Sequence, residues 1–361
     1  MKLIRSTKCS LKFATEAKQN QIELILTEYG RVVNFFINAF WDQSIEKKNL
    51  LKEIVNLPVT WLSARMRKVA AREAIDLISS AKEAAKEREE EPKVPVHKGE
   101  RMAVSSTIAE LTIPKNSKEF DAWLHLQSIG NNIIIDLPIK FHKHFHKWNN
   151  LPNSRRMNSY IITKDYVQFC FEIITEPKIT HGNYIGIDSG MNTLATASSN
   201  HSYGNELRKL IEDVNHSKKG SVNQKRRTRK LKQYIDKTAK DVISKEQPQV
   251  VVVEKLKNVF KNTKKKVPKF LRKLLGSWNY KYWLNRIEMQ CEENRVSFRT
   301  VSPYQTSITC SNCGNIEKSN RNGNIYKCNC CSIILNADYN ASINILNRWL
   351  KGAYGPHVSK T

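Results

Sequence analysis

Two cysteine pairs in the last sixty residues constrain the fold of this chain more than any other feature. Cys310 and Cys313 form one CxxC pair, Cys328 and Cys331 form a second, and residues 314–327 join them. Four thiolates at this spacing can surround one tetrahedral zinc ion, and such a site is structural because no coordination position stays open. The sequence therefore predicts a zinc ribbon with these four cysteines as ligands.

A fifth cysteine, Cys330, lies inside the second pair and is the alternative ligand. We expect Cys331 to bind the metal, because two intervening residues suit the turn that aims both thiolates of a knuckle at one point. The other cysteines, Cys9, Cys170 and Cys291, are isolated in the sequence. This distribution favours a metal site with reduced thiols over a framework of disulfides.

The second constraint is charge. The 361 residues include 60 Lys and Arg against 34 Asp and Glu, a formal net charge of +26. Such an excess predicts a polyanionic partner, either nucleic acid or an anionic membrane surface. No apolar run approaches the roughly 18 residues that cross a bilayer, and residues 1–10 lack the apolar core of a signal peptide. We therefore expect a cytoplasmic protein that binds nucleic acid and has no membrane partner.

Two segments concentrate the positive charge. Residues 225–232 contain six basic residues in eight, and residues 255–273 contain nine basic residues and no acid. Either segment could be a solvated helix face, but their density favours contact with phosphates of RNA or DNA. The candidate contact residues are Lys225, Arg226, Arg227, Arg229, Lys230, Lys264, Lys265 and Lys266.

The N-terminal half predicts a β unit interrupted by helices. A strand is expected within residues 2–13, followed by an amphipathic helix over about 16–42. A second helix is expected after Pro58, with Thr60 as its candidate N-cap and Pro92 closing it. Short strands and turns follow, the best strand candidates being 132–138, 159–163 and 166–174, the last two as a hairpin.

Three histidines alternate in the segment that follows the first of these strands. His142, His144 and His146 would share one face of a strand. A surface strand edge or contacts with an RNA backbone are favoured over a metal site, because no fourth ligand is evident nearby.

In the C-terminal half, three acids occupy comparable positions. Asp188 ends the apolar strand 184–188, Glu254 ends the apolar strand 249–254, and Asp338 opens an apolar helix. Each acid alone could be a strand end or a helix cap. Converging carboxylates, however, would repel one another unless divalent cations neutralised them, and oxygen ligands suit Mg²⁺ or Mn²⁺. Two such ions can activate water for attack on a phosphodiester, so the three acids are the candidate catalytic residues of a nuclease.

The motifs around these acids resemble those of a known family. Gly186-Ile-Asp188-Ser-Gly190, Val251-Val-Val-Glu254-Lys-Leu256 and Asp338-Tyr-Asn-Ala-Ser-Ile-Asn344 are similar to the three RuvC motifs of the TnpB family. Its members are transposon-encoded RNA-guided DNA endonucleases related to the miniature type V CRISPR effectors. The segment Thr306–Gly314 also resembles the TSxxCSxCG start of the family's zinc ribbon. The resemblance is strong over residues 184–346, and in the N-terminal half it extends only to the layout.

The resemblance implies an α+β multidomain fold. A split β-barrel wedge with a helical insertion would precede an RNase H-like RuvC domain that carries an inserted zinc ribbon. The implied boundaries are residues 1–15 and 93–178 for the wedge, 16–92 for the helical recognition region, 179–308 and 334–361 for the RuvC nuclease domain, and 309–333 for the ribbon. Further strands at 193–197 and 296–301 and a helix at about 278–293 are expected within the RuvC domain.

The resemblance also implies a function. Asp188, Glu254 and Asp338 would be the RuvC catalytic acids and the ligands of magnesium, with zinc structural. The partners would be a guide RNA and target double-stranded DNA, with one protein molecule per guide RNA, in a protein encoded with a transposable element. The alternatives are a nuclease-inactive RNA-guided DNA-binding protein or repressor, and an accessory transposase. The intact acids favour cleavage, because clustered negative charge beside DNA would not help a pure binder.

Overall fold

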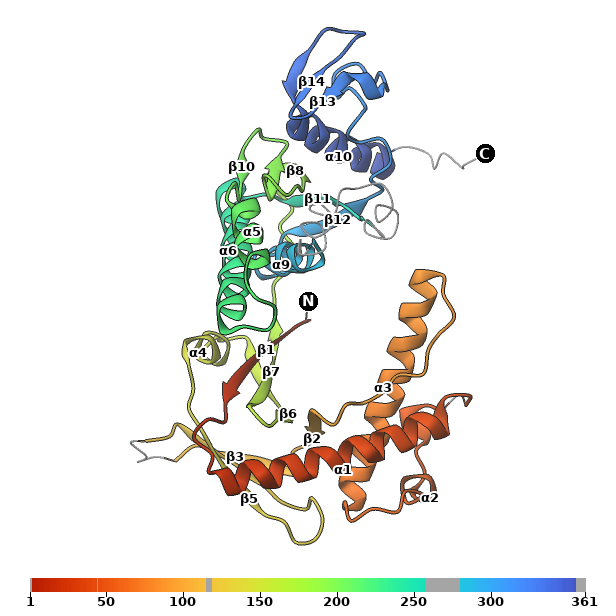
Figure 1. Cartoon of the computed structure of the whole chain (residues 1–361), viewed down its shortest axis with the longest axis vertical. Coiled ribbons are helices and arrows are strands. Elements are labelled where there is room, and N and C mark those ends of the chain that lie inside the picture. Colours follow the sequence, from red (N-terminus) through yellow and green to blue (C-terminus); the bar gives the residue numbers. More distant parts are fainter. Residues whose placement is uncertain (1, 44, 115–118, 257–279, 355–361) are drawn as a thin grey trace. The chain divides into compact units, whose positions relative to one another are not determined.

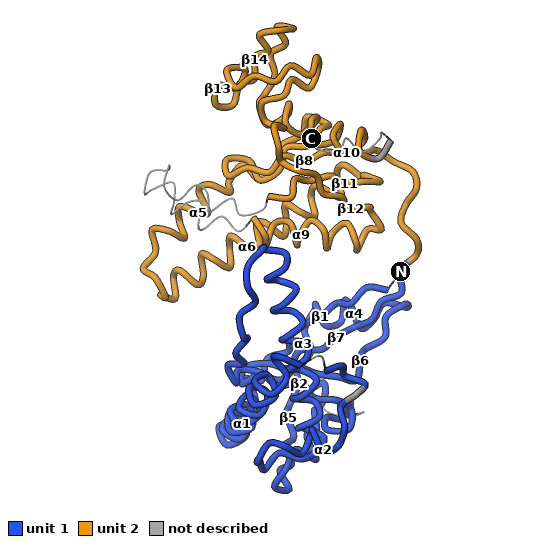
Figure 2. Tube along the Cα trace, turned by 90° about the vertical axis from the view of Figure 1, so that its right-hand side faces the viewer, with its two compact units in different colours: residues 1–175 blue, residues 176–361 orange. Residues whose placement is uncertain are grey.

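The computed structural model describes residues 2–43, 45–114, 119–256 and 280–354. The chain forms two compact units, residues 1–175 and 176–361 (Figure 2). The break between them falls close to the expected junction of wedge and RuvC domain. The finer division into four domains stays a prediction.

The first unit contains an antiparallel sheet whose strands run in the order β1-β7-β6-β2. In β1, exposed and buried residues alternate strictly, as expected of a strand with one face on a core. β6 and β7 form the predicted hairpin. The strands are β1 (Lys2–Ser10), β2 (Arg101–Val104), β6 (Ser154–Thr163) and β7 (Tyr166–Ile174).

A second, three-stranded antiparallel sheet belongs to the same unit. Its strands are β3 (Ala109–Thr112), β4 (Ala122–Leu126) and β5 (Ile135–Ile139). Strand pairing thus gives two sheets in the first unit, and closure into a barrel stays a prediction.

Two long helices follow β1, as the sequence predicts. α1 (Glu16–Phe40) packs against α3 (Ala64–Arg88), with the short η1 (Lys47–Asn49) and α2 (Lys52–Val55) between them (Figure 1). α1 buries Ile22, Tyr29 and Phe36 at helical spacing, which explains why this segment is helical. α3 ends at Arg88, before the proline expected to close it, because Glu89 adopts a left-handed conformation.

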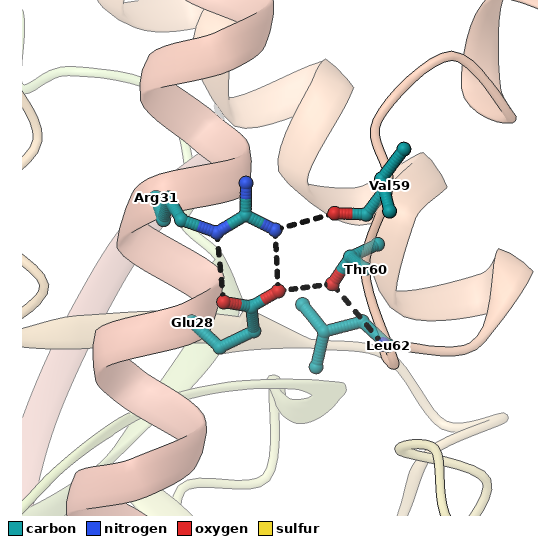
Figure 3. Close-up of polar contacts among 5 residues, drawn as sticks. All are labelled: Glu28, Arg31, Val59, Thr60 and Leu62. Carbon is teal, nitrogen blue, oxygen red and sulfur yellow. Dashed lines mark hydrogen bonds and ion pairs between the residues drawn. The ribbon is translucent and has the colours of Figure 1, made fainter.

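The expectation that Thr60 caps α3 is wrong. Ser63 is the N-cap, and its hydroxyl accepts a hydrogen bond from the Met66 backbone N–H at 3.2 Å. The Thr60 hydroxyl instead donates to Glu28 of α1, which is also held by Arg31 at 2.6 Å (Figure 3). The sequence could not show this use of Thr60, because Glu28 is distant along the chain.

The histidine segment is also different from the expectation. Residues Lys143–Asn149 form helix α4, and His142 caps it by accepting a hydrogen bond from the His144 backbone N–H at 3.1 Å. Phe145 and Trp148 face the core, so helical spacing of the aromatic residues overrides the alternation of the histidines. The three histidines therefore do not share a strand face.

The second unit is built on a mixed five-stranded sheet in the order β10-β9-β8-β11-β12. β8, β11 and β12 are parallel neighbours, while β9 and β10 add antiparallel strands. The strands are β8 (Tyr184–Asp188), β9 (Ala195–Ala197), β10 (Ser202–Tyr203), β11 (Val250–Glu254) and β12 (Ser297–Val301). This is the mixed sheet that the RuvC resemblance implies.

Helices cover both faces of this sheet (Figure 1). Val251 and Val253 of β11 belong to one core with α5 (Leu207–Asn215), α6 (Val222–Glu246) and α9 (Tyr280–Glu293). Val250 and Val252 point the other way and pack with Ile345 of α10 (Ala337–Tyr354). The uninterrupted run of valines is thus explained by burial of both faces.

A small ribbon lies between β12 and α10 in the chain. It consists of η2 (Lys318–Asn320) and the antiparallel strands β13 (Arg321–Asn322), β14 (Ile325–Lys327) and β15 (Ile334–Asn336). Tyr326 is fully buried in it and donates a hydrogen bond to the Ile308 carbonyl at 3.2 Å. Within the described residues, no helix of either unit is long and apolar enough to span a lipid bilayer.

Candidate active site and zinc centre

Two of the predicted acids emerge from the same end of the sheet. Strands β8 and β11 are parallel neighbours in which Ile187 pairs with Val253. Asp188 and Glu254 are the next residues on each strand, so both carboxylates lie at the carboxyl edge. Parallel pairing explains why two acids that are distant in sequence come together.

The third acid comes from the helix that crosses this sheet. Asn336 caps α10 by accepting hydrogen bonds from the backbone N–H groups of Asp338 (2.9 Å) and Tyr339 (3.0 Å). α10 approaches β8 very closely at Gly186, where a Cβ would lie 2.2 Å from the Ser342 carbonyl oxygen. Only glycine fits there, so the GID motif sets the position of α10, and hence of Asp338, relative to Asp188.

Electrostatics shows that two of the acids act on the third. The pKa of Asp188 is raised to about 7, first by burial and then by the negative charges of Asp338 and Glu254. Burial also raises the pKa of Glu254, against the effect of a hydrogen bond from the Thr306 hydroxyl. Burial is the larger cause of both shifts, and the effect of Asp338 and Glu254 on Asp188 shows that both acids lie within electrostatic reach of it.

An arginine that the sequence reasoning missed lies among these acids. Arg321 of β13 forms an ion pair with Asp338, Nη2 to Oδ1 3.0 Å, and both side chains are half buried. Its positive charge also lowers the pKa of Asp188 and of Glu254. Arg321 is the single arginine between the two cysteine pairs and belongs to no motif there, so neither spacing nor periodicity indicates its role.

The carboxylate oxygens do not form a finished ligand cluster. Among the described His, Cys, Asp and Glu side chains, only the four cysteines gather their ligand atoms tightly enough for a metal ion. Mutual repulsion of the acids and the hold of Arg321 on Asp338 account for the difference. The donor chemistry nevertheless fits a divalent cation, because Glu254 and Asp338 lie within electrostatic reach of Asp188 and carboxylate oxygens are ligands that such ions prefer.

Hydrogen bonds hold the segments around Glu254. The Tyr280 hydroxyl donates to the Glu254 carbonyl at 2.5 Å. The buried Asn344 amide donates to the carbonyls of Thr306 (2.9 Å) and Thr309 (2.7 Å), which fixes the loop whose Thr306 hydroxyl binds Glu254. Helix α9 thus holds the backbone of Glu254, and α10, through the loop of Thr306, holds its carboxylate.

The four predicted zinc ligands do come together. Sγ–Sγ distances are 3.7 Å for Cys310 with Cys331 and 3.6 Å for Cys313 with Cys328, and all four atoms lie within 4.8 Å of one another. Tetrahedral zinc with Zn–S bonds of about 2.3 Å requires sulfurs about 3.8 Å apart, so the residues fit the ion. Cys330 is exposed and lies outside this group.

The pKa values of the clustered cysteines diverge: burial and hydrogen bonds with the other three cysteines raise the pKa of Cys313 to about 12, whereas backbone hydrogen bonds lower the pKa of Cys328. The Asn312 amide donates to the Cys331 sulfur at 3.5 Å. This hydrogen bond, together with one from the Ile333 backbone, lowers the pKa of Cys331 to about 6. None of the eight cysteines forms a disulfide. The arrangement supports the expectation of reduced thiols around a metal ion.

The predicted nucleic-acid contacts divide into three sets. On α6, the side chains of Lys225, Arg226, Arg229 and Lys230 are exposed. Arg227 instead donates to the Asp213 carbonyl (2.7 Å) and to the Ser217 hydroxyl (3.2 Å), so it braces the helix start. Lys264, Lys265 and Lys266 lie outside the described residues.

Comparison with known proteins singles out the C-terminal segment. Residues 280–345 match the family model described as Cas12f1-like, TNB domain. This range includes α9, the ribbon and Asp338, and it stops short of the strands that carry Asp188 and Glu254.

Two curated relatives are both named CRISPR-associated endodeoxyribonuclease Cas12f1. The protein from an uncultured archaeon is 38% identical over 87 residues, 22% of this chain and 16% of the relative. The one from Sulfoacidibacillus thermotolerans is 40% identical over 74 residues, 20% of this chain and 18% of the relative. The chain thus matches less than a fifth of the length of either relative.

One solved structure shares the fold over the whole chain. The mini-RNA-guided endonuclease CRISPR-Cas_phi3 has a TM-score of 0.58 and 8% identity, covering 100% of this chain and 94% of that one. The likeness to miniature type V effectors is therefore confirmed for the C-terminal segment by sequence and for the fold by structure. The TnpB family itself is not singled out by these matches and stays a prediction.

Proposed function

We propose that this protein is an RNA-guided DNA endonuclease that cleaves phosphodiester bonds in a RuvC-like site. The observation that supports the proposal most is that Glu254 of β11 and Asp338 of α10 lie near enough to Asp188 of β8 to raise its pKa by their charge, in addition to the larger effect of burial. The names of the relatives, both endodeoxyribonucleases, support the same reaction. The basic surface of α6 and the net charge of +26 suit binding to RNA and DNA.

The three acids would hold Mg²⁺ or Mn²⁺, and these ions, when bound in a pair, supply the Lewis acidity that activates water and stabilises the leaving oxygen. The chain's own residues prepare this site. Thr306 orients Glu254, and Gly186 lets α10 bring Asp338 to the sheet edge. The guanidinium of Arg321 has donors beyond the one used by Asp338, and these suit a phosphate oxygen.

We propose a guide RNA and target double-stranded DNA as partners, one protein molecule per guide RNA, a cytoplasmic location and an origin with a transposable element. Zn²⁺ would be structural in the ribbon. A nuclease-inactive RNA-guided binder or repressor remains the alternative, and an accessory transposase is the other. The acids separate them, because a binder gains nothing from a buried Asp188 whose pKa is raised by burial and then by two neighbouring acids.

The test uses the protein purified with its copurifying RNA. The RNA is sequenced, and a DNA carrying the complement of its variable end is the substrate. We expect cleavage in Mg²⁺, none in EDTA, and a loss of at least about 100-fold in rate for Asp188→Asn and Glu254→Gln.

Glu246→Gln is the matched control, because Glu246 is an acid of the same unit whose mostly buried side chain accepts a hydrogen bond from the Tyr203 hydroxyl and pairs with His201. Tight DNA occupancy without product by the parent protein would instead establish the binder. Strand-transfer products from the isolated protein would establish the transposase.

A further inference from the structure

Helix α9 presents two aromatic side chains whose polar ends reach the ends of strands β8 and β11. Tyr280 and Trp283 are three residues apart, so they lie on one helix face. Both are buried, in the core that also contains Ile187 and Val253. Ile187 and Val253 directly precede the acids that end β8 and β11. One face of α9 therefore packs in the same core as the last apolar residue of each strand.

The indole of Trp283 binds the residue that follows Asp188. Its Nε1–H donates to the Ser189 hydroxyl oxygen at 2.9 Å. The Ser189 backbone N–H in turn hydrogen-bonds the Asp188 carboxylate, which lowers the pKa of Asp188 against the larger effect of burial. A buried indole N–H needs a partner, and here the partner residue is the one that contacts the acid. Trp283 thus holds the Asp188 carboxylate through Ser189.

The phenol of Tyr280 makes the corresponding contact at β11. Its hydroxyl donates to the Glu254 carbonyl at 2.5 Å and accepts a hydrogen bond from the Leu256 backbone N–H. These two bonds fix the backbone on both sides of residue 255, where the strand ends. Burial, followed by the charges of Glu254 and Asp188, raises the pKa of Tyr280, so its hydroxyl lies within electrostatic reach of both acids.

We propose that Tyr280 and Trp283 are positioning residues that hold the Asp188 and Glu254 carboxylates at a fixed separation for a divalent cation. The inference rests on the proposed nuclease function, which makes these carboxylates the ligands. Each aromatic side chain acts through the backbone next to a ligand. Because both belong to one helix face, they hold the two acids relative to each other. Groups that orient a metal ligand in this way typically account for about 10- to 100-fold in metal affinity.

The test measures Mn²⁺ binding by the full-length protein freed of RNA, without DNA, from the electron paramagnetic resonance signal of the unbound ion. Asp188→Asn identifies the binding that belongs to the site. Tyr280→Phe and Trp283→Phe each remove a polar group and keep an apolar ring, and each should weaken this binding about 10-fold. DNA cleavage should slow by a similar factor, while the Kd for DNA stays that of the parent.

Tyr282→Phe is the matched control, because it removes a phenol hydroxyl from the same helix. The Tyr282 hydroxyl donates to Asp236 of α6 at 2.7 Å, so its loss should leave Mn²⁺ binding unchanged. Ser189→Ala removes the Trp283 hydrogen bond from its other side. The double variant should lose no more affinity than either single variant, because both changes remove the same hydrogen bond. Melting temperatures in EDTA show that each variant is folded.

Equal losses of Mn²⁺ affinity in Tyr282→Phe and Tyr280→Phe would overturn the proposal. Absence of Asp188-dependent Mn²⁺ binding in the parent would overturn both the positioning role and the nuclease site. A parent that binds Mn²⁺ through Asp188 but never cuts DNA would refute the nuclease while the positioning role stands. A parent that cuts DNA, with Tyr280→Phe and Trp283→Phe binding Mn²⁺ normally, would refute the positioning role alone.

Discussion

Arg321 in the zinc ribbon and Asp338 at the start of α10 form an ion pair with Nη2 and Oδ1 3.0 Å apart. The pair links the ribbon that carries the four-cysteine cluster directly to a candidate catalytic acid. Because the charge of Arg321 also acts on Asp188 and Glu254, one side chain from the ribbon compensates part of the charge of all three acids. The ribbon is therefore part of the electrostatics of the site.

Removing this charge should destabilise the metal-free protein. In EDTA, Arg321→Gln should lower the free energy of unfolding by about 1 kcal/mol, since the acids lose a half-buried counter-charge. In Mg²⁺ the loss should shrink, because the cation replaces the guanidinium charge. Thermal unfolding with and without Mg²⁺ measures the loss of stability under both conditions. Arg299→Gln, at an exposed arginine of β12, is the control, and an equal loss there would contradict the role of Arg321.

Gly186→Ala should displace α10. Its Cβ would lie 2.2 Å from the Ser342 carbonyl oxygen and 2.8 Å from the Leu346 nitrogen, so the backbone must move. We expect a loss of about 1–3 kcal/mol in stability, as for other overpacked cores, and loss of DNA cleavage. Gly352 lies in α10 itself, and a Cβ there would have no neighbour within 4 Å. Gly352→Ala is therefore the control and should be neutral or stabilising. Unchanged cleavage by Gly186→Ala would show that Asp338 does not need this close packing.

The cysteines should differ in their effect on zinc. Cys310→Ser and Cys331→Ser should abolish the binding of one zinc ion per chain and unfold the ribbon, because each removes a thiolate of a four-sulfur site. Cys330→Ser should retain the full zinc content, since Cys330 is exposed and outside the cluster. Zinc released from the purified protein by a thiol reagent gives the number of zinc ions bound per chain. Zinc loss in Cys330→Ser with retention in Cys331→Ser would reverse the assignment.

The stability of the metal-free protein should depend on pH through Asp188. Its pKa rises from 3.8 to about 7 on folding, so the folded state binds the proton more tightly than the unfolded state. This contribution is complete below about pH 4 and is lost as the pH rises through about 7. Relative to Asp188→Asn, the parent should lose on the order of 4 kcal/mol over that range. Melting temperatures in EDTA between pH 5 and pH 8 test it; a constant difference between the two proteins would contradict it.

The features that follow from spacing and strand order could be predicted from the sequence. The cysteine pairs define their own cluster through the CxxC turns, and apolar strands that end in acids predict where Asp188 and Glu254 lie. Both depend on short segments whose geometry is local. The long helices followed from periodicity for the same reason, whereas the mixed sheet was implied by the family resemblance.

The features that depend on tertiary contacts could not be predicted. Arg321 has no local signal, and its role arises only when the ribbon folds back onto α10. Thr60 looked like a cap but binds Glu28 of another helix. The histidines alternate as in a strand, yet the segment is a helix. A helix buries both Phe145 and Trp148, and burying these two large apolar side chains stabilises the fold more than a strand pattern of histidines would.

The packing of α10 against one face of the sheet has a consequence for synthesis. Val250 and Val252 are made long before Ile345, so a growing chain exposes that apolar face until α10 leaves the ribosome. Asp338 arrives with the same helix. A chain released before that point would carry the positive charge of α6 without the third acid, and it could hold nucleic acid but not cut it. Completion of α10 would therefore bury the open face and supply the third acid of the candidate site in a single step.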